Sequence, residues 1–222
     1  RIIKMLNVFD DQLVIENKGI YSIEKFILAR RLMYWQVYLH KTVLSAEQML
    51  VKTLQRAKEL SSQGEELFAT PDLSFFLKGN YSLNDFQNDP SILANFANID
   101  DHDISSSIKV WAKHEDKVLS DLSQRLINRE LYKLEIQTEP FDEHKIQALE
   151  QQWQEKYPGY QGYQNYYIFT GTTENKAYNP EEENIKVLQK ENYLKDLIDS
   201  SEELNESTIT QTIHKNYLCN PK

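Results

Sequence analysis

The longest helical pattern in the chain runs from Ser22 to about Gln63, a segment with neither glycine nor proline. Ser22 is a good N-cap, and Gly64 supplies a left-handed position at which helices commonly end. We predict one long helix, roughly 60 Å if unbroken at about 1.5 Å per residue, which suggests a kink, a central spine or a helix shared with another subunit. Its apolar residues recur at three- and four-residue steps, as on one helix face: Phe26, Ile27, Met33, Val37, Leu44, Met49, Leu50, Leu54 and Ala57.

The first half of this helix combines cations with phenol rings. At about 100° per residue, Arg30, Tyr34, Tyr38 and Lys41 fall on one face, and His40 lies to one side of it. Arginine and lysine bind phosphate oxygens, and tyrosine offers a stacking face and a hydroxyl. The pattern therefore suits an anionic ligand that carries a ring. The alternative, which composition favours, is a half-buried helix with snorkelling cations and tyrosines at the boundary of a core.

The remaining pattern divides the chain into a helical part and a mixed part. We predict a mainly α fold, with a helical region built on the long central helix at residues 1–129. A C-terminal α+β subdomain with a small antiparallel sheet follows at residues 130–222. The predicted elements are a strand at Gln12–Glu16, short helices within residues 65–98, a helix capped by Asp103, a further helix to residue 128, a strand from near Leu131, a helix at Glu143–Lys156, and strands at residues 166–170, 184–189 and 212–219.

Composition narrows the possible environments and partners. The net charge of −9 disfavours nucleic acid as a partner. The single cysteine, Cys219, excludes an internal disulfide, fits a cytoplasmic location and has no activating neighbour in the sequence. No apolar run approaches the roughly 18–20 residues of a membrane span. The chain opens at Arg1 on an apolar helical pattern without a cap, so we expect a fragment whose upstream part packs against it.

Two sets of polar residues resemble sites but have plainer interpretations. The run Asp100-Asp101-His102-Asp103 contains metal-ligand side chains, but it stands where a helix should start, and capping explains it. Arg129 and Lys133 stand four residues apart, as an ordinary exposed basic pair does. The sequence shows no phosphate-binding loop, nucleophile elbow or paired-histidine zinc motif. We therefore predict neither a catalytic residue nor a metal ligand in this chain.

Two segments carry a family resemblance. In the first, a lead-in helix and a short hairpin precede a long helix with Arg30 and, eight residues later, the pattern Tyr38-x-His40-Lys41. In the second, a helix pair ends in the sequence RELYK at residues 129–133. Residues 1–136 thereby resemble the region that follows the HD core in HD-domain phosphohydrolases of the deoxynucleoside triphosphate triphosphohydrolase type. Residues 137–222 resemble the appended α+β region of bacterial members more loosely.

This resemblance implies a chemistry and a set of contacts. A divalent metal held by two histidines and two aspartates of the HD core activates the water that releases inorganic triphosphate. The HD core is absent from this chain, so the chain binds no metal itself, and we expect it to be inactive alone. The resemblance assigns Arg30 to the triphosphate, Tyr38 to the sugar, and His40 and Lys41 to the substrate or a neighbouring nucleotide, while helix geometry adds Tyr34. It also implies that Arg129 and Lys133 hold an activating nucleotide at a subunit interface of a homo-oligomer.

Two functions therefore stay open. The first is the C-terminal portion of a metal-dependent phosphohydrolase that acts on nucleoside triphosphates, with the upstream HD core of the same protein as its partner. The second is a helical binding or oligomerisation module without catalysis, which the long helix and the missing core favour.

Overall fold

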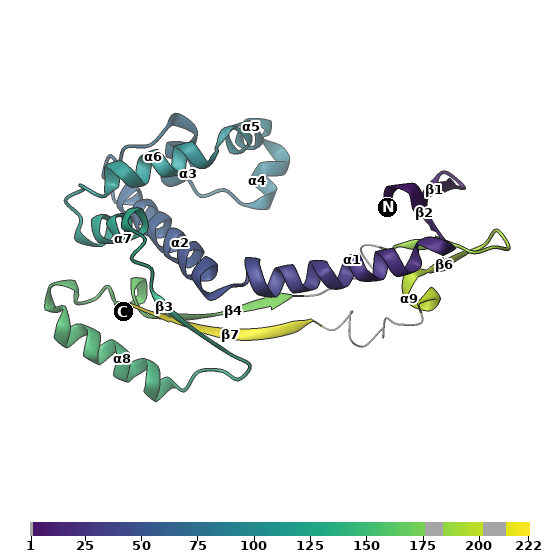
Figure 1. The fold of residues 1–222 in the computed structure, drawn as a ribbon. Coiled ribbons are helices and arrows are strands. Elements are labelled where there is room, and N and C mark those ends of the chain that lie inside the picture. Colours follow the sequence, from purple (N-terminus) through teal and green to yellow (C-terminus); the bar gives the residue numbers. More distant parts are fainter. Residues whose placement is uncertain (1, 176–183, 202–211) are drawn as a thin grey trace. The chain divides into compact units, whose positions relative to one another are not determined.

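The computed structural model describes residues 2–175, 184–201 and 212–222 (Figure 1). The chain forms two compact units that interleave along the sequence. The first unit takes residues 1–40, 137–139 and 171–216, and the second takes residues 41–136, 140–170 and 217–222. The predicted division into residues 1–129 and 130–222 stays a prediction.

The first unit packs helix α1 against a small sheet. Strands β1 and β2 form an antiparallel hairpin, which turns at Asp10 and Asp11 with φ of 49° and 59°. β2 pairs in parallel with β5, and β5 pairs antiparallel with β6, so the sheet order is β1-β2-β5-β6. Its elements are the 3-10 turns Ile2–Met5 and Asn17–Gly19, β1 Leu6–Phe9, β2 Gln12–Glu16, α1 Ile20–Met33, a π-helix at Tyr34–Tyr38, β5 Lys186–Leu188, β6 Leu194–Asp196 and α9 Leu197–Ser200.

One face of α1 supplies three of the six residues in the buried core cluster of this unit. Its buried residues recur at three- and four-residue steps, as expected for a helix lying on a sheet. The other faces of α1 keep large apolar side chains exposed to solvent. The buried cluster consists of Ile15, Ile20, Ile23, Ile27, Val187 and Leu197.

The second unit is a helical body centred on α2. Helix α2 contacts α3 and α7, and α6 contacts α7. The core includes Trp111, which is 1% exposed and whose Nε1 donates a hydrogen bond of 2.9 Å to the carbonyl of Phe68. Its helices are α2 Lys41–Ser62, α3 Pro71–Lys78, α4 Leu83–Asn88, α5 Pro90–Asn98, α6 Asp101–Trp111, α7 Lys117–Asn128 and α8 Glu143–Lys156, followed by 3-10 turns at Pro158–Tyr160 and Gln164–Tyr166.

A second sheet has the strand order β3-β7-β4. Its strands are β3 Lys133–Gln137, β7 Ile213–Asn220 and β4 Phe169–Asn175. Together with the helices it confirms the predicted class, a mainly α protein with a small antiparallel sheet. Helix α8 has the predicted bounds, whereas β4 begins three residues later than predicted and β3 begins two residues after Leu131.

The predicted long helix is interrupted. α1 continues into the π-helix, the chain leaves the helical path at Leu39 and His40, and α2 begins at Lys41. The amide of Leu39 donates to the carbonyl of Tyr34 over 2.7 Å, which is the five-residue bond of a π-helix. The helix is therefore broken between the π-helix and α2, whereas a helix shared with another subunit stays a prediction.

Neither Ser22 nor Asp103 occupies the N-cap position that the sequence predicts for it, whereas the predicted end of the second helical segment at Gly64 is correct. α1 begins at Ile20, directly after a 3-10 turn, so Ser22 lies inside the helix. The N-cap of α6 is Asp100, and Asp103 is the third residue of that helix. Gly64 has φ of 93°, as predicted for the residue that ends α2. Among the described helices, none combines the length and the apolar character needed to cross a bilayer.

Candidate functional site

An open groove on the first unit contains three of the five predicted substrate residues. The groove has a volume of about 500 Å³, and Arg30, Tyr34 and Tyr38 line it. We call it the tyrosine groove; its lining residues are Phe26, Ala29, Arg30, Met33, Tyr34 and Tyr38. Phe26 and Met33 are among the apolar positions of the predicted helix, and they stand four and three residues from Arg30. Ala29 was not singled out, although it stands three residues from Phe26 and four from Met33.

The polar members of the tyrosine groove contact one another in series. The guanidinium carbon of Arg30 lies 5.1 Å from the ring centroid of Tyr34, within the range of a cation–π contact. The Tyr34 and Tyr38 rings follow at a centroid distance of 5.1 Å and an interplanar angle of 56°. Both tyrosines belong to the π-helix, and π-helical turns occur often at functional sites.

The charge of the groove favours an anion. Arg30 is the basic residue among the described residues that line it, and none of those residues is acidic. A guanidinium binds phosphate oxygens through a rigid fork of donors, and a phenol ring stacks on a base or sugar. The arrangement therefore provides a cation and two aromatic faces along a single helix.

The residues that line this groove do not include His40 or Lys41. Neither residue lines it, because the helical path ends at Leu39 and Lys41 starts α2 in the second unit. The single face that was predicted for Arg30, Tyr34, Tyr38 and Lys41 required an unbroken α-helix, so that geometric argument fails for Lys41.

The predicted effector residues lie in the second unit. Arg129 is exposed and ends α7 in the left-handed conformation, with φ of 58° and ψ of 34°. Lys133 opens β3, and its Nζ lies 2.9 Å from Glu135, which also accepts from Lys145 over 2.6 Å. These two lysines lower the pKa of Glu135 to about 2, with the Lys145 hydrogen bond as the larger cause. The effector role of Arg129 and Lys133 stays a prediction.

The acidic run Asp100–Asp103 caps the start of α6. Asp100 accepts from the amides of His102 and Asp103, and the Asp103 carboxylate accepts from the amide of Asp100, which completes a capping box. The His102 side chain is 93% exposed. The described residues contain no group of three or more histidine, cysteine, aspartate or glutamate side chains that fits a metal ion. A divalent metal therefore has no fitting ligand set in the described part of this chain.

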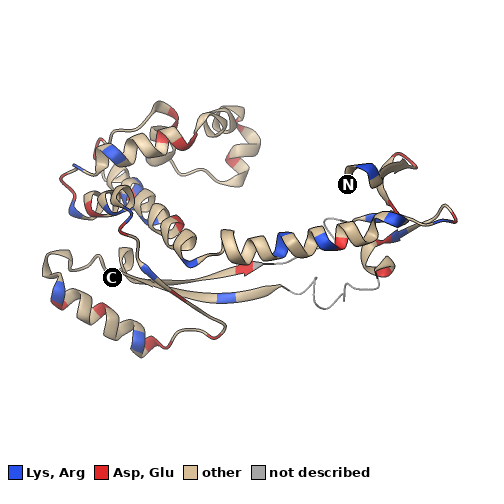
Figure 2. Ribbon diagram, viewed as in Figure 1, with Lys and Arg blue, Asp and Glu red and all other residues tan. Residues whose placement is uncertain are grey.

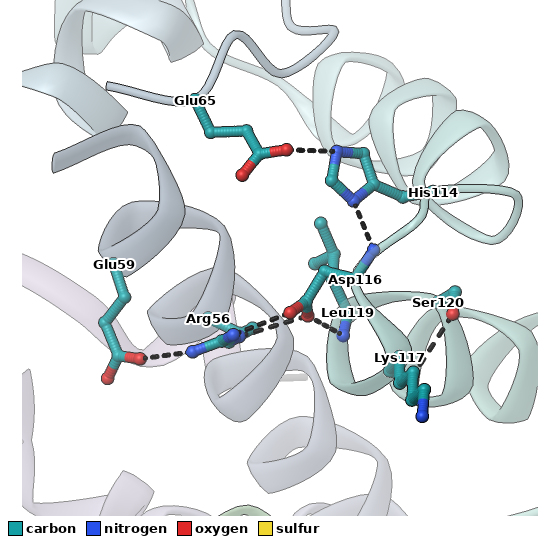
Figure 3. Close-up of polar contacts among 8 residues, drawn as sticks. All are labelled: Arg56, Glu59, Glu65, His114, Asp116, Lys117, Leu119 and Ser120. Carbon is teal, nitrogen blue, oxygen red and sulfur yellow. Dashed lines mark hydrogen bonds and ion pairs between the residues drawn. The ribbon is translucent and has the colours of Figure 1, made fainter. Parts of the chain in front are cut away.

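The second unit contains a polar cluster that the sequence did not reveal (Figure 3). Arg56 of α2, only 7% exposed, donates from Nε over 3.1 Å and from Nη2 over 2.6 Å to the two oxygens of Asp116. Asp116 is also the N-cap of α7 and accepts from the Leu119 amide over 2.8 Å. Nη1 of Arg56 donates to Glu59 over 3.1 Å. The cluster therefore ties α2 to the start of α7.

The hydrogen bonds and pKa shifts of this cluster indicate that it stabilises the fold of the second unit. Burial alone would raise the pKa of Asp116, but the hydrogen bonds from Arg56 and Leu119 lower it below its ordinary value. The hydrogen bonds to Asp116 and Glu59 raise the pKa of Arg56 despite its burial. His114 accepts at Nδ1 from the Asp116 amide over 3.0 Å, which leaves its ring proton on Nε2, 3.7 Å from Glu65. Arg56, Asp116 and His114 thus each form a hydrogen bond or ion pair with another residue of the second unit.

Comparison with known proteins provides the context for these sites. Residues 1–89, which include the tyrosine groove, match the family model for the HD associated region. Over its whole length the chain is similar to a phosphohydrolase of Bacteroides thetaiotaomicron of known crystal structure, with 48% identity and a TM-score of 0.88. Part of the chain is thus similar to the HD associated region, and its whole length is similar to part of a protein named a phosphohydrolase.

Two further similar proteins show how much of a longer relative this chain covers. Over 134 residues, 60% of the chain, it is 35% identical to the uncharacterized protein YwfO of Bacillus subtilis. A hypothetical protein of Aquifex aeolicus, with 20% identity over the whole chain and a TM-score of 0.56, shares the fold. The chain spans 55% of the Bacteroides protein, 47% of the Aquifex protein and 28% of YwfO. The chain therefore corresponds to one part of longer relatives.

Proposed function

We propose that this chain supplies substrate contacts to an HD-type metal-dependent phosphohydrolase that acts on deoxynucleoside or nucleoside triphosphates. The observation that carries the proposal is the series Arg30, Tyr34 and Tyr38 in the tyrosine groove, within the HD-associated region. Arg30 binds the phosphates, and the two tyrosine rings pack on the sugar and base. The phosphohydrolase name of the Bacteroides relative supports the same reaction class.

The contribution of this chain is binding and orientation. Cations that neutralise the phosphates lower the barrier to their transfer. The described residues offer no fitting set of metal ligands, so we assign no metal-dependent step to them. His40 and Lys41 stay proposed substrate contacts on the resemblance alone, since no described geometry brings them to the groove.

Nucleotide binding to the 222-residue chain tests the proposal directly. Isothermal titration calorimetry would compare deoxynucleoside triphosphates, inorganic tripolyphosphate and nucleosides. Charge-assisted hydrogen bonds contribute about 1.5–3 kcal/mol, so Arg30→Gln should weaken triphosphate binding by about 10- to 100-fold. The same change should leave nucleoside binding unaltered, because a nucleoside carries no phosphate.

The matched control is Arg31→Gln, which removes the neighbouring guanidinium on the same helix but none that lines the groove. Tyr34→Leu should weaken nucleoside and triphosphate binding alike, because stacking contributes about 1–3 kcal/mol per base. Equal effects of the Arg30 and Arg31 changes would refute a specific phosphate contact. So would triphosphate binding that is unaffected by Arg30→Gln.

We also propose Arg129 and Lys133 as contacts for a regulatory nucleotide. The exposure of both side chains supports access from solvent. Lys133 already shares Glu135 with Lys145, so a nucleotide phosphate would compete with that carboxylate for the ammonium group.

A further inference from the structure

The second unit contains a small cavity walled by aromatic rings. Its volume is about 90 Å³, the space of about three water molecules. Helix α7 contributes an acid and a base, and the chain from α8 onward contributes four rings. Figure 2 shows acidic and basic residues along α8, but the residue that α8 itself gives to the cavity is Trp153. We call it the aromatic cavity; its lining residues are Asp121, Arg125, Trp153, Tyr157, Tyr160 and Tyr167.

The rings of the aromatic cavity are steeply inclined to one another. Trp153 stacks on Tyr167 at a centroid distance of 4.5 Å. The ring of Tyr160 makes an angle of 63° with Trp153, 78° with Tyr167 and 89° with Tyr157. The centroids of these inclined pairs lie 5.6–6.5 Å apart. A cation that faces two perpendicular rings at this spacing lies about 4–5 Å from both centroids, within the roughly 6 Å range of a cation–π contact.

Two polar groups of the aromatic cavity can bind such a cation. Tyr167 is 1% exposed, and its buried hydroxyl has no hydrogen-bond partner within the described part of the chain. Buried hydroxyls are rarely left in that state, so the group points to a ligand or water. The Asp121 carboxylate accepts from Nε of Arg125 over 2.8 Å, which uses one of its roughly four acceptor positions.

The electrostatics of the aromatic cavity favour a cation over an anion. Burial raises the pKa of Tyr160, the Asp121 carboxylate raises it further, and Arg125 lowers it by less. Burial and then the Asp121 carboxylate also raise the pKa of Tyr167. At both hydroxyls the effect of the aspartate therefore exceeds that of the arginine, although the two side chains form an ion pair.

Two cations of the protein contact rings in this region. The guanidinium carbon of Arg125 lies 6.0 Å from the ring centroid of Tyr132, which does not line the cavity. Nζ of Lys156 lies 5.2 Å from the ring centroid of Tyr157. We therefore base the site on the rings of Trp153, Tyr160 and Tyr167.

We propose that the aromatic cavity binds a small alkylammonium ion that carries an N–H, of the size of trimethylammonium. Its methyl groups contact the rings of Trp153 and Tyr160, its N–H donates to the Tyr167 hydroxyl, and Asp121 balances its charge. Aromatic rings grouped in this way are the usual means by which proteins recognise methylated ammonium groups. Tyr160 is half-buried and the Asp121 side chain is 24% exposed, so solvent reaches the site.

NMR of the 222-residue chain labelled with nitrogen-15 tests the proposal. Titration with trimethylammonium should give a saturable shift of the Trp153 indole N–H signal. The Trp111 signal is the internal reference, because this buried tryptophan of the same unit does not line the cavity. The neutral molecule tert-butanol, of nearly the same shape, should bind at least about fivefold more weakly because it lacks the charge. Acetate, an anion, should give no saturable shift.

Substitutions separate the ring from the carboxylate. Tyr160→Leu should weaken trimethylammonium binding at least about fivefold, whereas Tyr160→Phe keeps the ring and should bind as wild type does. Asp121→Asn should weaken it at least about tenfold, because the balancing charge is lost. The matched controls are Tyr193→Leu, at an exposed tyrosine of the first unit, and Glu155→Gln, at an exposed acid of α8. Both should leave binding unchanged.

Tyr167→Phe tests the hydrogen bond without disturbing the fold. The hydroxyl that it removes has no partner within the described residues, so its loss should not destabilise the protein. The variant should bind trimethylammonium more weakly than wild type does. Its affinity for tetramethylammonium should be unchanged, because that ion has no N–H to donate. Circular dichroism would confirm that each variant is folded.

A longer probe identifies the source of the alkylammonium group. Tighter binding of dimethyl-lysine amide than of trimethylammonium would support the proposal with a protein side chain as the source, and the reverse order would support it with a free amine. Three results would overturn it: no saturable shift of the Trp153 signal, equal binding of tert-butanol, or full binding by both Tyr160→Leu and Asp121→Asn. None of these probes carries a phosphate, so the outcome is independent of the calorimetric result for Arg30.

Discussion

The Arg56–Asp116 pair allows a quantitative test of what holds α2 to α7. Asp116 has two structural roles: it caps α7, and it neutralises the guanidinium of Arg56, a residue that is 7% exposed. Asp116→Ala removes both. Asp116→Ser removes the charge but keeps an oxygen that can cap the helix. The difference between the two variants therefore isolates the cap.

The magnitudes follow from the contacts. Removing one partner of a buried ion pair costs about 3–5 kcal/mol, because the other charge stays buried without compensation. Arg56 keeps its bond to Glu59, which is about half exposed, so we expect the lower end, about 3 kcal/mol, for Asp116→Ser. A lost N-cap costs about 1 kcal/mol more, which brings Asp116→Ala to about 4 kcal/mol. Arg56→Met with Asp116→Ser should recover part of this loss, because it removes the stranded charge.

Urea unfolding followed by tryptophan fluorescence would measure these differences. A Trp35→Phe background leaves Trp111 and Trp153 as reporters, and both belong to the second unit. A cost below about 1 kcal/mol for Asp116→Ala would refute the reasoning, because the pair would then resemble an exposed ion pair. Equal costs for the serine and alanine variants would refute the contribution of the cap.

Acid provides a second test of the same pair. The native pKa of Asp116 lies below its ordinary value of 3.8, so its stabilising contribution is complete above that value. The contribution is lost as the pH falls through the lower native pKa, where the carboxylate of the folded protein takes up a proton. The difference in free energy of unfolding between wild type and Asp116→Ala should therefore be constant from neutral pH to about pH 5 and become smaller in stronger acid. A difference that grows on acidification would contradict this sign.

Two further predictions concern single side chains. Burial raises the pKa of the Cys219 thiol to about 12, so the native protein should react slowly with iodoacetamide at pH 8. Unfolding in urea should expose the thiol to rapid alkylation. Fast labelling of the native protein would contradict the buried position of Cys219. The carboxyl of Glu135 should titrate near pH 2 by carbon-13 NMR, and Lys145→Ala should raise that midpoint towards 4.5; an unchanged midpoint would show that the hydrogen bond is absent in solution.

The sequence predicted best where a structure depends on near neighbours. The helix at Glu143–Lys156 and the strand Gln12–Glu16 appear with their expected bounds. The contact of Arg30 with Tyr34 also follows from a four-residue step within one helix. Cys219 is buried, in line with the inert thiol expected from its neighbours in the sequence.

The features that depend on distant parts of the chain were not predictable in this way. The interruption at Leu39 and His40 has no glycine or proline to mark it, so the periodicity appears continuous there. Arg56 and Asp116 stand 60 residues apart, and neither belongs to a motif. Asp116 precedes a helix and could have been assigned as a cap, but its ion-pair partner depends on how α2 and α7 pack.

The exposed surface of α1 supports the proposed function. A helix that is apolar on most of its faces belongs in an interior, where other groups surround it. In the first unit, one face of α1 packs on the sheet, while the tyrosine groove and a second row of exposed side chains, Tyr21, Leu28 and Leu32, face solvent. These two faces differ in chemistry. The groove pairs a cation with phenol rings and suits a nucleotide, whereas the second row is formed by one tyrosine and two leucines. A nucleotide in the tyrosine groove would cover part of the apolar surface that α1 exposes in the described part of the chain.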